Sequence, residues 1–247
     1  MSDPSDKHCG FLSPNESKGN VWRTYFLVVL LIGPPGSGKG TQASRLKQWL
    51  EIPAISTGDL FRLEIGKKTK LGMEAEKVIN QGLLVEDLLV QKMLQTRLTE
   101  PDCSRGFLLD GYPRTVVQAI YLSELLAKAG RPEPLVLHID VPAELLIARM
   151  SSRRGCSLCG RIYNLLNTPP RAVGVCDDDG SALLHREDDR GEVIRQRLEA
   201  YETWTRPVVE HYANGSYYKV DGNRPPSEVF VSIAEGVNRH RTQLQQS

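Results

Sequence analysis

The sequence predicts an α/β fold, in which helices cover both faces of a parallel five-stranded sheet and two smaller segments are inserted. Two observations carry this prediction. Short apolar runs bounded by Gly, Pro or Asp are typical of buried strands, and they alternate along the chain with longer segments of helical periodicity. Such alternation is typical of sheets that bind ligands at the carboxyl ends of their strands. The expected strands cover residues 26–32, 52–55, 106–109, 135–141 and 217–220, of which 52–55 has the weakest pattern.

The expected helices lie between these strands. Pro142 stands at the first turn of one of them, where its missing N–H costs nothing. Residues 155–189 break the alternation, because Gly, Asp, Pro and Cys dominate there and no helical period survives. We therefore expect an insertion with its own means of stabilisation. The helices are expected over residues 39–50, 59–65, 71–81, 87–99, 116–129, 143–153, 192–212 and 226–239.

The chain ends and the bulk composition limit the class of protein. Residues 1–24 are mostly polar and predict a disordered extension, followed by a domain over 25–239 and a C-terminal tail over 240–247. The 31 basic and 30 acidic residues give a formal charge of +1, which argues against nucleic acid or an anionic membrane as partner. The apolar run 25–32 is shorter than the roughly 20 residues that span a bilayer. Cleavage of a signal peptide after this run would cut into the loop that follows it.

A glycine-rich loop is the strongest motif. The residues GPPGSGKGT begin at Gly33, directly after an expected strand and before an expected helix, which matches the P-loop pattern G-x-x-x-x-G-K. Backbone N–H groups in such a loop close around phosphate oxygens, and the lysine reaches the outer phosphates. The alternative is a glycine turn without a ligand. Gly40 holds the place of the usual Ser or Thr and Thr41 follows it, so the motif predicts phosphate binding by the loop but does not by itself predict that a loop hydroxyl coordinates the metal. The expected phosphate-binding residues are Gly36, Ser37, Gly38, Lys39, Gly40 and Thr41.

The second substrate is indicated by further motifs, since a P-loop alone is compatible with GTPases, motor ATPases and small kinases. These motifs are ISTGDLFR from Ile55, GFLLDGYPRT followed by Gln118, and an arginine-rich stretch over 149–197. With the glycine loop, they resemble the adenylate kinases over residues 27–237. The resemblance implies a P-loop core that transfers a phosphoryl group reversibly from MgATP to AMP, giving two ADP. It also implies a monomer with a helical AMP-binding insertion at 56–85 and a lid at 152–189 that closes over the substrates.

Arginines suit this chemistry because their planar groups bind phosphate through two hydrogen bonds and stay charged. Fixed cations also stabilise the transition state of phosphoryl transfer. Each arginine could instead be a solvated helix charge. By resemblance, Arg62 and Arg114 grip the AMP phosphate and Arg149 stacks on the adenine of ATP. The residues implied as catalytic are Lys39, Arg114, Arg153, Arg186 and Arg197.

Two polar residues are candidates for metal and base recognition. Asp110 ends an expected strand, where a carboxylate can hold Mg²⁺ through water, or can simply cap the next turn. Gly111 stands where hydrolytic ATPases carry a glutamate, which favours transfer over hydrolysis. By resemblance, the amide of Gln118 reads the adenine of AMP, although the residue could instead face solvent. The resemblance adds Arg153, Ile162, Tyr163 and Arg224 to the ATP site. It implies AMP contacts from Thr57, Arg62, Leu83, Leu84, Val85, Gly111, Tyr112, Pro113, Arg114, Gln118, Arg186 and Arg197.

The lid carries a candidate metal site. Cys156 and Cys159 are followed after sixteen residues by Cys176 and, at a matching two-residue gap, Asp179. Three thiolates and a carboxylate can bind one structural Zn²⁺, and the alternatives are Asp177 or Asp178 as fourth ligand or a loop of reduced thiols. The odd number of five cysteines favours a reducing compartment, so we expect a cytoplasmic protein.

Two rival functions stay open at this point. One is a kinase for another nucleoside monophosphate. The other is a zinc-knuckle module that binds nucleic acid under the control of ATP, although the knuckle is acidic at 177–179 and has Tyr163 as its one aromatic residue.

Overall fold

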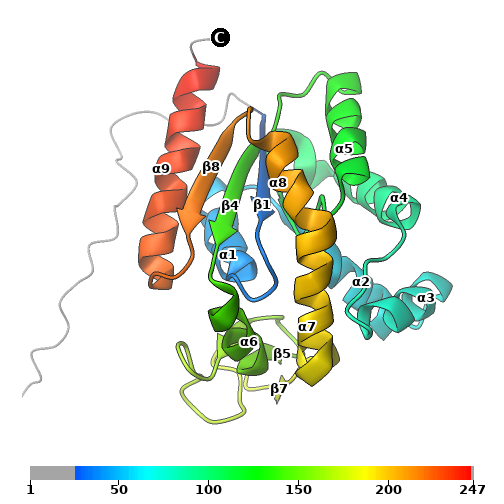
Figure 1. The fold of residues 1–247 in the computed structure, drawn as a ribbon, viewed down its shortest axis with the longest axis vertical. Coiled ribbons are helices and arrows are strands. Elements are labelled where there is room, and N and C mark those ends of the chain that lie inside the picture. The colour runs from blue at the N-terminus through cyan, green and yellow to red at the C-terminus, as the bar shows by residue number, and fades with distance from the viewer. Residues whose placement is uncertain (1–25, 246–247) are drawn as a thin grey trace, which may run out of the picture.

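The computed structural model describes residues 26–245, so the extension expected over 1–24 lies outside the described residues. Its centre is a parallel five-stranded sheet in the order β2-β3-β1-β4-β8, which confirms the predicted sheet (Figure 1). The strands are β1 Leu27–Ile32, β2 Ala54–Ser56, β3 Gly106–Asp110, β4 Leu135–Asp140 and β8 Tyr217–Asp221.

Both faces of the sheet are buried, and the central strand β1 is apolar at every position. In β1, Leu27, Val29 and Leu31 pack on one face, and the alternate side chains pack on the other. The first face is covered by α1 Lys39–Leu50, α6 Ala143–Ser151 and α9 Pro226–Leu244. The second face is covered by α4 Asp87–Leu98, α5 Val116–Lys128 and α8 Arg206–Tyr212. This double cover leaves the strand ends as the place for a site.

Two insertions lie at the carboxyl ends of the strands (Figure 1). The helices α2 Thr57–Gly66 and α3 Lys70–Ile79 pack on each other directly after β2. The second insertion follows α6 and contains an antiparallel sheet of β5 Arg153–Cys156, β6 Ile162–Asn164 and β7 Leu183–Leu184, in the order β6-β5-β7. A 3₁₀ turn, Glu187–Asp189, then leads into α7 Gly191–Ala200, and another 3₁₀ turn, Pro101–Arg105, precedes β3.

Several helix ends differ from the prediction. The helix expected over 143–153 ends at Ser151, because Arg153 opens β5. The helix expected over 192–212 is divided into α7, a π-helical turn at Tyr201–Thr205, and α8. Pro207, which has no N–H and crowds the preceding turn, accounts for this break. The last helix continues past residue 239 to Leu244 because His240 is still buried, so the first residues of the predicted tail are helical.

Among the helices of residues 26–245, none combines the length and the apolar character needed to cross a membrane.

The contact between α2 and α3 gives a prediction about stability. A Cβ on Gly72 would lie 2.2 Å from the backbone oxygen of Glu64, and backbone cannot move aside as a side chain can. Gly72→Ala should therefore destabilise the protein by about 1–3 kcal/mol, which corresponds to a melting temperature lower by about 3–10 °C. The matched control is Gly66→Ala, since no atom lies within 4 Å of that position. Equal melting temperatures for the two variants would contradict the close packing.

Candidate functional site

One cavity of about 970 Å³ lies at the carboxyl edge of the sheet, between the core and both insertions. This volume is at the upper end of the range for small-molecule sites. Its walls contain almost every predicted nucleotide-site residue, drawn from the glycine loop, from α2, from the segment after β3 and from the lid. The predicted residues that line it are Gly36, Ser37, Gly38, Lys39, Gly40, Thr41, Thr57, Arg62, Leu83, Leu84, Val85, Asp110, Gly111, Pro113, Arg114, Gln118, Arg149, Arg153, Ile162, Tyr163, Arg186, Arg197 and Arg224.

The glycine loop connects β1 to α1. Gly36 and Gly38 have φ angles of 83° and 97°, which other residues rarely adopt. A Cβ on Gly36 would also lie 2.9 Å from Cγ of Met150, whereas a Cβ on Gly38 would meet no atom within 4 Å. The buried hydroxyl of Ser37 has no hydrogen-bond partner among the described residues. The loop thus lines the cavity and leads into the N-terminus of α1, an arrangement that suits an anion.

Lys39 lies in the same loop. Its Nζ donates to the carbonyl oxygens of Gly33 at 2.7 Å and Pro34 at 2.9 Å. Burial lowers the pKa of Lys39 to about 7, against the opposing effect of the carboxylate of Asp110. An anion beside Nζ would favour the charged form, so this lysine is suited to a ligand that carries several negative charges.

Asp110 is the last residue of β3 and borders the glycine loop. A Cβ on Gly40 would lie 3.7 Å from its Oδ2. Burial raises the pKa of Asp110, and the charge of Lys39 opposes that shift. Within residues 26–245, no hydrogen bond or ion pair occupies its carboxylate oxygens. Oxygen ligands of this kind are those that hard divalent cations prefer.

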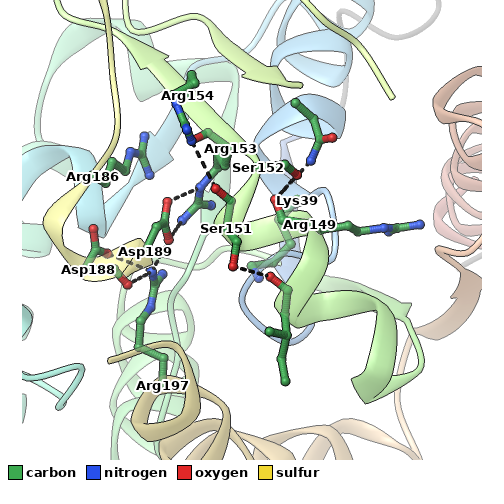
Figure 2. A network of polar contacts seen from close by, with 12 residues as sticks. Lys39, Arg149, Ser151, Ser152, Arg153, Arg154, Arg186, Asp188, Asp189 and Arg197 are labelled. Carbon is green, nitrogen blue, oxygen red and sulfur yellow. Dashed lines mark hydrogen bonds and ion pairs between the residues drawn. The ribbon is translucent and has the colours of Figure 1, made fainter. Parts of the chain in front are cut away.

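A buried ion-pair cluster holds two arginines, Arg153 and Arg197, at the lid side of the cavity. Asp189 is fully buried, and its Oδ2 accepts from Nε of Arg153 at 2.6 Å while its Oδ1 accepts from Nη1 of Arg197 at 2.7 Å. Arg197 also pairs with Asp188 at 2.9 Å. Figure 2 shows Asp189 between the two guanidinium groups, with Arg186 nearby and Arg149 pointing away. The sequence analysis missed both aspartates, although they follow Arg186 and Glu187 in a run of charged residues.

The two insertions approach each other across the cavity. Asp59 on α2 accepts from Nη2 of Arg62 at 2.5 Å and lies 3.9 Å from Nη2 of Arg186 in the second insertion. Burial disfavours ionisation of Asp59, but the guanidinium charges of Arg62 and Arg186 lower its pKa overall. Burial also lowers the pKa of Arg186 to about 10, and the like charge of Arg62 adds to this shift. Asp59 was not among the predicted site residues.

The segment after β3 fixes Arg114. Its Nε donates to the carbonyl oxygen of Gly111 at 2.8 Å, and the same oxygen accepts from Oγ1 of Thr57 at 2.9 Å. The backbone N–H of Arg114 donates to Oε1 of Gln118 at 2.7 Å. Burial lowers the pKa of Arg114 to about 10, and Arg197 contributes to the shift. Arg114 is therefore rigidly held while part of its guanidinium faces the cavity.

The structure places the predicted residue Tyr112 outside the cavity and Arg149 in its wall. Tyr112 does not line the cavity, since its side chain is buried in the core and its hydroxyl donates to the backbone oxygen of Gln118 at 3.2 Å. The reason is that Gly111 and Pro113 on either side of Tyr112 face the cavity, whereas its ring packs toward α5. Arg149 lines the cavity, and its Nη1 donates to the backbone oxygen of Gly222 at 3.0 Å.

The four predicted metal ligands meet in the lid. The sulfur atoms of Cys156, Cys159 and Cys176 and a carboxylate oxygen of Asp179 all lie within 4.8 Å of one another. The Sγ atoms of Cys159 and Cys176 are 3.6 Å apart, and Sγ of Cys156 lies 3.2 Å from Oδ2 of Asp179. Tetrahedral zinc with bonds of about 2.3 Å to sulfur separates its sulfur ligands by roughly 3.8 Å. This group of side chains can thus hold a metal ion.

Asp177 and Asp178, the alternative fourth ligands of the metal, make other contacts. Asp178 pairs with Arg161, and Asp177 accepts from the backbone N–H of Arg171 at 2.9 Å. Backbone N–H groups of Leu158 and Cys159 donate to Sγ of Cys156, both at 3.3 Å. Such outer hydrogen bonds stabilise thiolate ligands.

The arrangement defines a class of enzyme. A phosphate loop at the edge of a doubly covered parallel sheet shares one cavity with arginines from two insertions. Fold and cavity together are those of a phosphotransferase of the nucleoside monophosphate kinase class.

Comparison with known proteins names the family within this class. The family model described as adenylate kinase matches residues 31–217, which is more than half of the chain. The chain belongs to the adenylate kinase family. It is 47% identical over 208 residues to an adenylate kinase of Syntrophomonas wolfei, covering 84% of this chain and 97% of that protein. It is 44% identical over 212 residues to one of Thermosipho melanesiensis, covering 85% and 99%. An Acholeplasma laidlawii adenylate kinase is 45% identical over 208 residues, covering 84% and 96%.

The ion-pair cluster gives a second prediction about stability. Asp189→Ala would leave the guanidinium groups of Arg153 and Arg197 close together without their shared carboxylate. Removing one partner of such a buried pair typically costs about 3–5 kcal/mol of stability. The free energy of unfolding measured in urea should therefore fall by this amount. The control is Glu192→Ala, which removes an exposed ion pair to Arg195 and should cost about 1 kcal/mol or less. Similar losses in both variants would show that the cluster does not depend on Asp189.

Proposed function

We propose that this chain transfers the terminal phosphoryl group of MgATP to AMP and that it runs the reaction reversibly, giving two ADP. The observation that carries the proposal is one cavity that is lined both by a phosphate loop and by the guanidinium groups of Arg62 and Arg114. Two nucleotides bound from opposite ends would meet with their phosphates between the two groups of cations. The family membership supports the same reaction.

The loop and Lys39 would hold the ATP phosphates. The loop lines the cavity, so its backbone N–H groups would bind phosphate oxygens, and the ligand's charge would keep Lys39 protonated. Arg149 and Arg224, which line the cavity beyond the loop, would contact the rest of ATP together with Ile162 and Tyr163.

The chemical step needs no base from the protein. An oxygen of the AMP phosphate, which is already ionised at neutral pH, attacks the γ-phosphorus of ATP. The new P–O bond forms as the bond between that phosphorus and the β–γ bridging oxygen breaks, and the electron pair leaves with the β-phosphate of ADP. Arg114, Arg153, Arg186 and Arg197 would stabilise the charge spread over the transferring group.

Magnesium fits the residues present. Among residues 26–245, the carboxylate of Asp110 has no hydrogen-bond or ion-pair partner, and it borders the loop, as a site for a hard cation bound with phosphates requires. When bound, Mg²⁺ neutralises charge on the β- and γ-phosphate oxygens. Asp110 would hold the ion, and Thr41, which also lines the cavity, is a hydroxyl of the motif that could assist it.

The acceptor site would select adenine through Gln118. Its amide lines the cavity close to Thr57 and to residues 83–85, which would form the rest of the base pocket. With both insertions in contact across Asp59 and Arg186, water would be kept from the phosphates during transfer.

The metal of the lid is, in this proposal, a structural Zn²⁺ held by Cys156, Cys159, Cys176 and Asp179. The ligand distances and the four-ligand closed set support this choice. The lid buries few apolar side chains, so a metal would supply much of its folding energy.

A monomer in the cytoplasm completes the proposal. The four described cysteines, which are Cys103, Cys156, Cys159 and Cys176, are free thiols, as a reducing compartment favours. The near-neutral charge balance gives no reason to invoke nucleic acid or a membrane as partner.

The proposed reaction is tested by supplying ADP and Mg²⁺ alone. The purified chain should form ATP and AMP, and in the other direction AMP should be a better acceptor than GMP, UMP or CMP. Arg114→Ala should lower kcat by about 10³ or more, as the loss of a comparable arginine does, while the melting temperature changes little by comparison. Absence of ATP formation, or rapid use of UMP with little use of AMP, would refute the proposal. A loss of less than tenfold would remove Arg114 from the chemical step.

The proposed zinc site is tested by metal content and stability. Elemental analysis should find about one zinc per chain, and a chelator should lower the melting temperature, because the lid loses its metal-dependent folding energy. Cys176→Ser should lose the metal, whereas the control Cys103→Ser should keep it, since Cys103 lies outside the cluster. A protein without zinc whose melting temperature ignores the chelator would show that the four side chains have another role.

A further inference from the structure

Asp87 lies just outside the cavity wall, at the first position of α4 and two residues after the segment 83–85. Its carboxylate is used fully within the protein. Oδ1 accepts from Nε2 of Gln118 at 2.7 Å, and Oδ2 accepts from Oγ1 of Thr115 at 3.0 Å. Asp87 does not line the cavity, and neither the motifs nor the proposed reaction assigns it a role.

The contacts of Gln118 admit one orientation of its amide. Oε1 accepts from the backbone N–H of Arg114 at 2.7 Å, while Nε2 donates to Asp87. After a flip, Oε1 would face the carboxylate of Asp87 and the amide NH₂ would face the N–H of Arg114. Both pairs would then be repulsive, in a place where the side chain of Gln118 is only 2% exposed. The amide keeps one N–H and one oxygen lone pair free.

This fixed orientation matters for the base that is read. Adenine presents an acceptor at N1 and an amino donor at position 6, whereas hypoxanthine presents an N–H donor at N1 and an acceptor at position 6. The two bases have nearly the same size and shape, so size alone separates them poorly. An amide locked in one orientation matches one pattern and opposes the other, and an amide free to flip matches either.

We propose that Asp87 is a specificity-determining residue of the acceptor site, which acts by locking the amide of Gln118 so that AMP is accepted and IMP is rejected. The inference rests on the proposed function, in which Gln118 reads the acceptor base. Asp87 is a positioning residue in this role, because it touches Gln118 and not the substrate. The backbone N–H of Arg114 provides the second half of the lock.

The test is steady-state kinetics with ATP as donor and AMP or IMP as acceptor. In Asp87→Ala, the ratio of kcat/KM for AMP to kcat/KM for IMP should fall by about tenfold or more, because a bidentate contact discriminates between bases by this order. The KM for AMP should rise, kcat/KM for IMP should increase, and the KM for ATP should stay within about twofold of wild type. Asp87→Asn, whose amide can rotate to suit either orientation, should give an intermediate ratio.

The matched control is Glu86→Ala, which removes the neighbouring exposed carboxylate with no side-chain contact to Gln118. Its AMP to IMP ratio should equal that of wild type. If Asp87 only ties α4 to α5, Asp87→Ala will lower the melting temperature and slow both acceptors equally, and an unchanged ratio overturns the inference. Should Asp87→Ala fail to fold, an unchanged ratio in Asp87→Asn overturns it in the same way. A wild-type protein that does not use AMP overturns the proposed function instead.

Discussion

The site depends on holding many positive charges together in a buried cavity. Lys39 and seven arginines line the cavity, and burial lowers the pKa of Lys39, Arg114 and Arg186. Like charges at such spacing repel, and desolvation adds to the cost. The protein offsets this cost with carboxylates from both insertions, of which Asp188 and Asp189 are buried, and with backbone carbonyl oxygens such as that of Gly111. The arginines are thereby kept in place.

The fold makes this concentration of charge feasible. Both faces of the sheet are packed with apolar side chains. The polar groups of the site therefore lie at the strand ends or on the segments that follow them. Lys39 follows β1 by way of the glycine loop, and Asp110 ends the neighbouring strand β3, so both lie where the carboxyl ends of the two strands meet. Arg62, Arg153 and Arg186 come from the two insertions, and the other arginines come from segments of the core.

The sequence predicts the strands and motifs that form the site better than it predicts the aspartates that hold the site residues in place. The strands, the glycine loop and the four lid ligands follow from local patterns, because each depends on residue types at short spacing. Asp59, Asp188, Asp189 and Asp87 were missed, since an aspartate in a charged run reads as a solvated residue until its partner is known. Those partners lie on other elements, as Asp87 with Gln118 shows. The break in the helix before Pro207 was missed because helical periodicity continues across a single wider turn.

The supporting carboxylates hold the arginines without using up their capacity to bind phosphate. A guanidinium has five N–H donors in a planar fork. Arg153 gives Nε and Nη2 to Asp189, and Arg114 gives only Nε to Gly111, so each keeps donors for a second acceptor. An acceptor with two oxygens can bind such a free edge through parallel hydrogen bonds. One edge of the guanidinium thus fixes each arginine to the protein, while the other edge stays available to an anion. A lysine at the same position could not do both in this way, because its ammonium is a single point of charge.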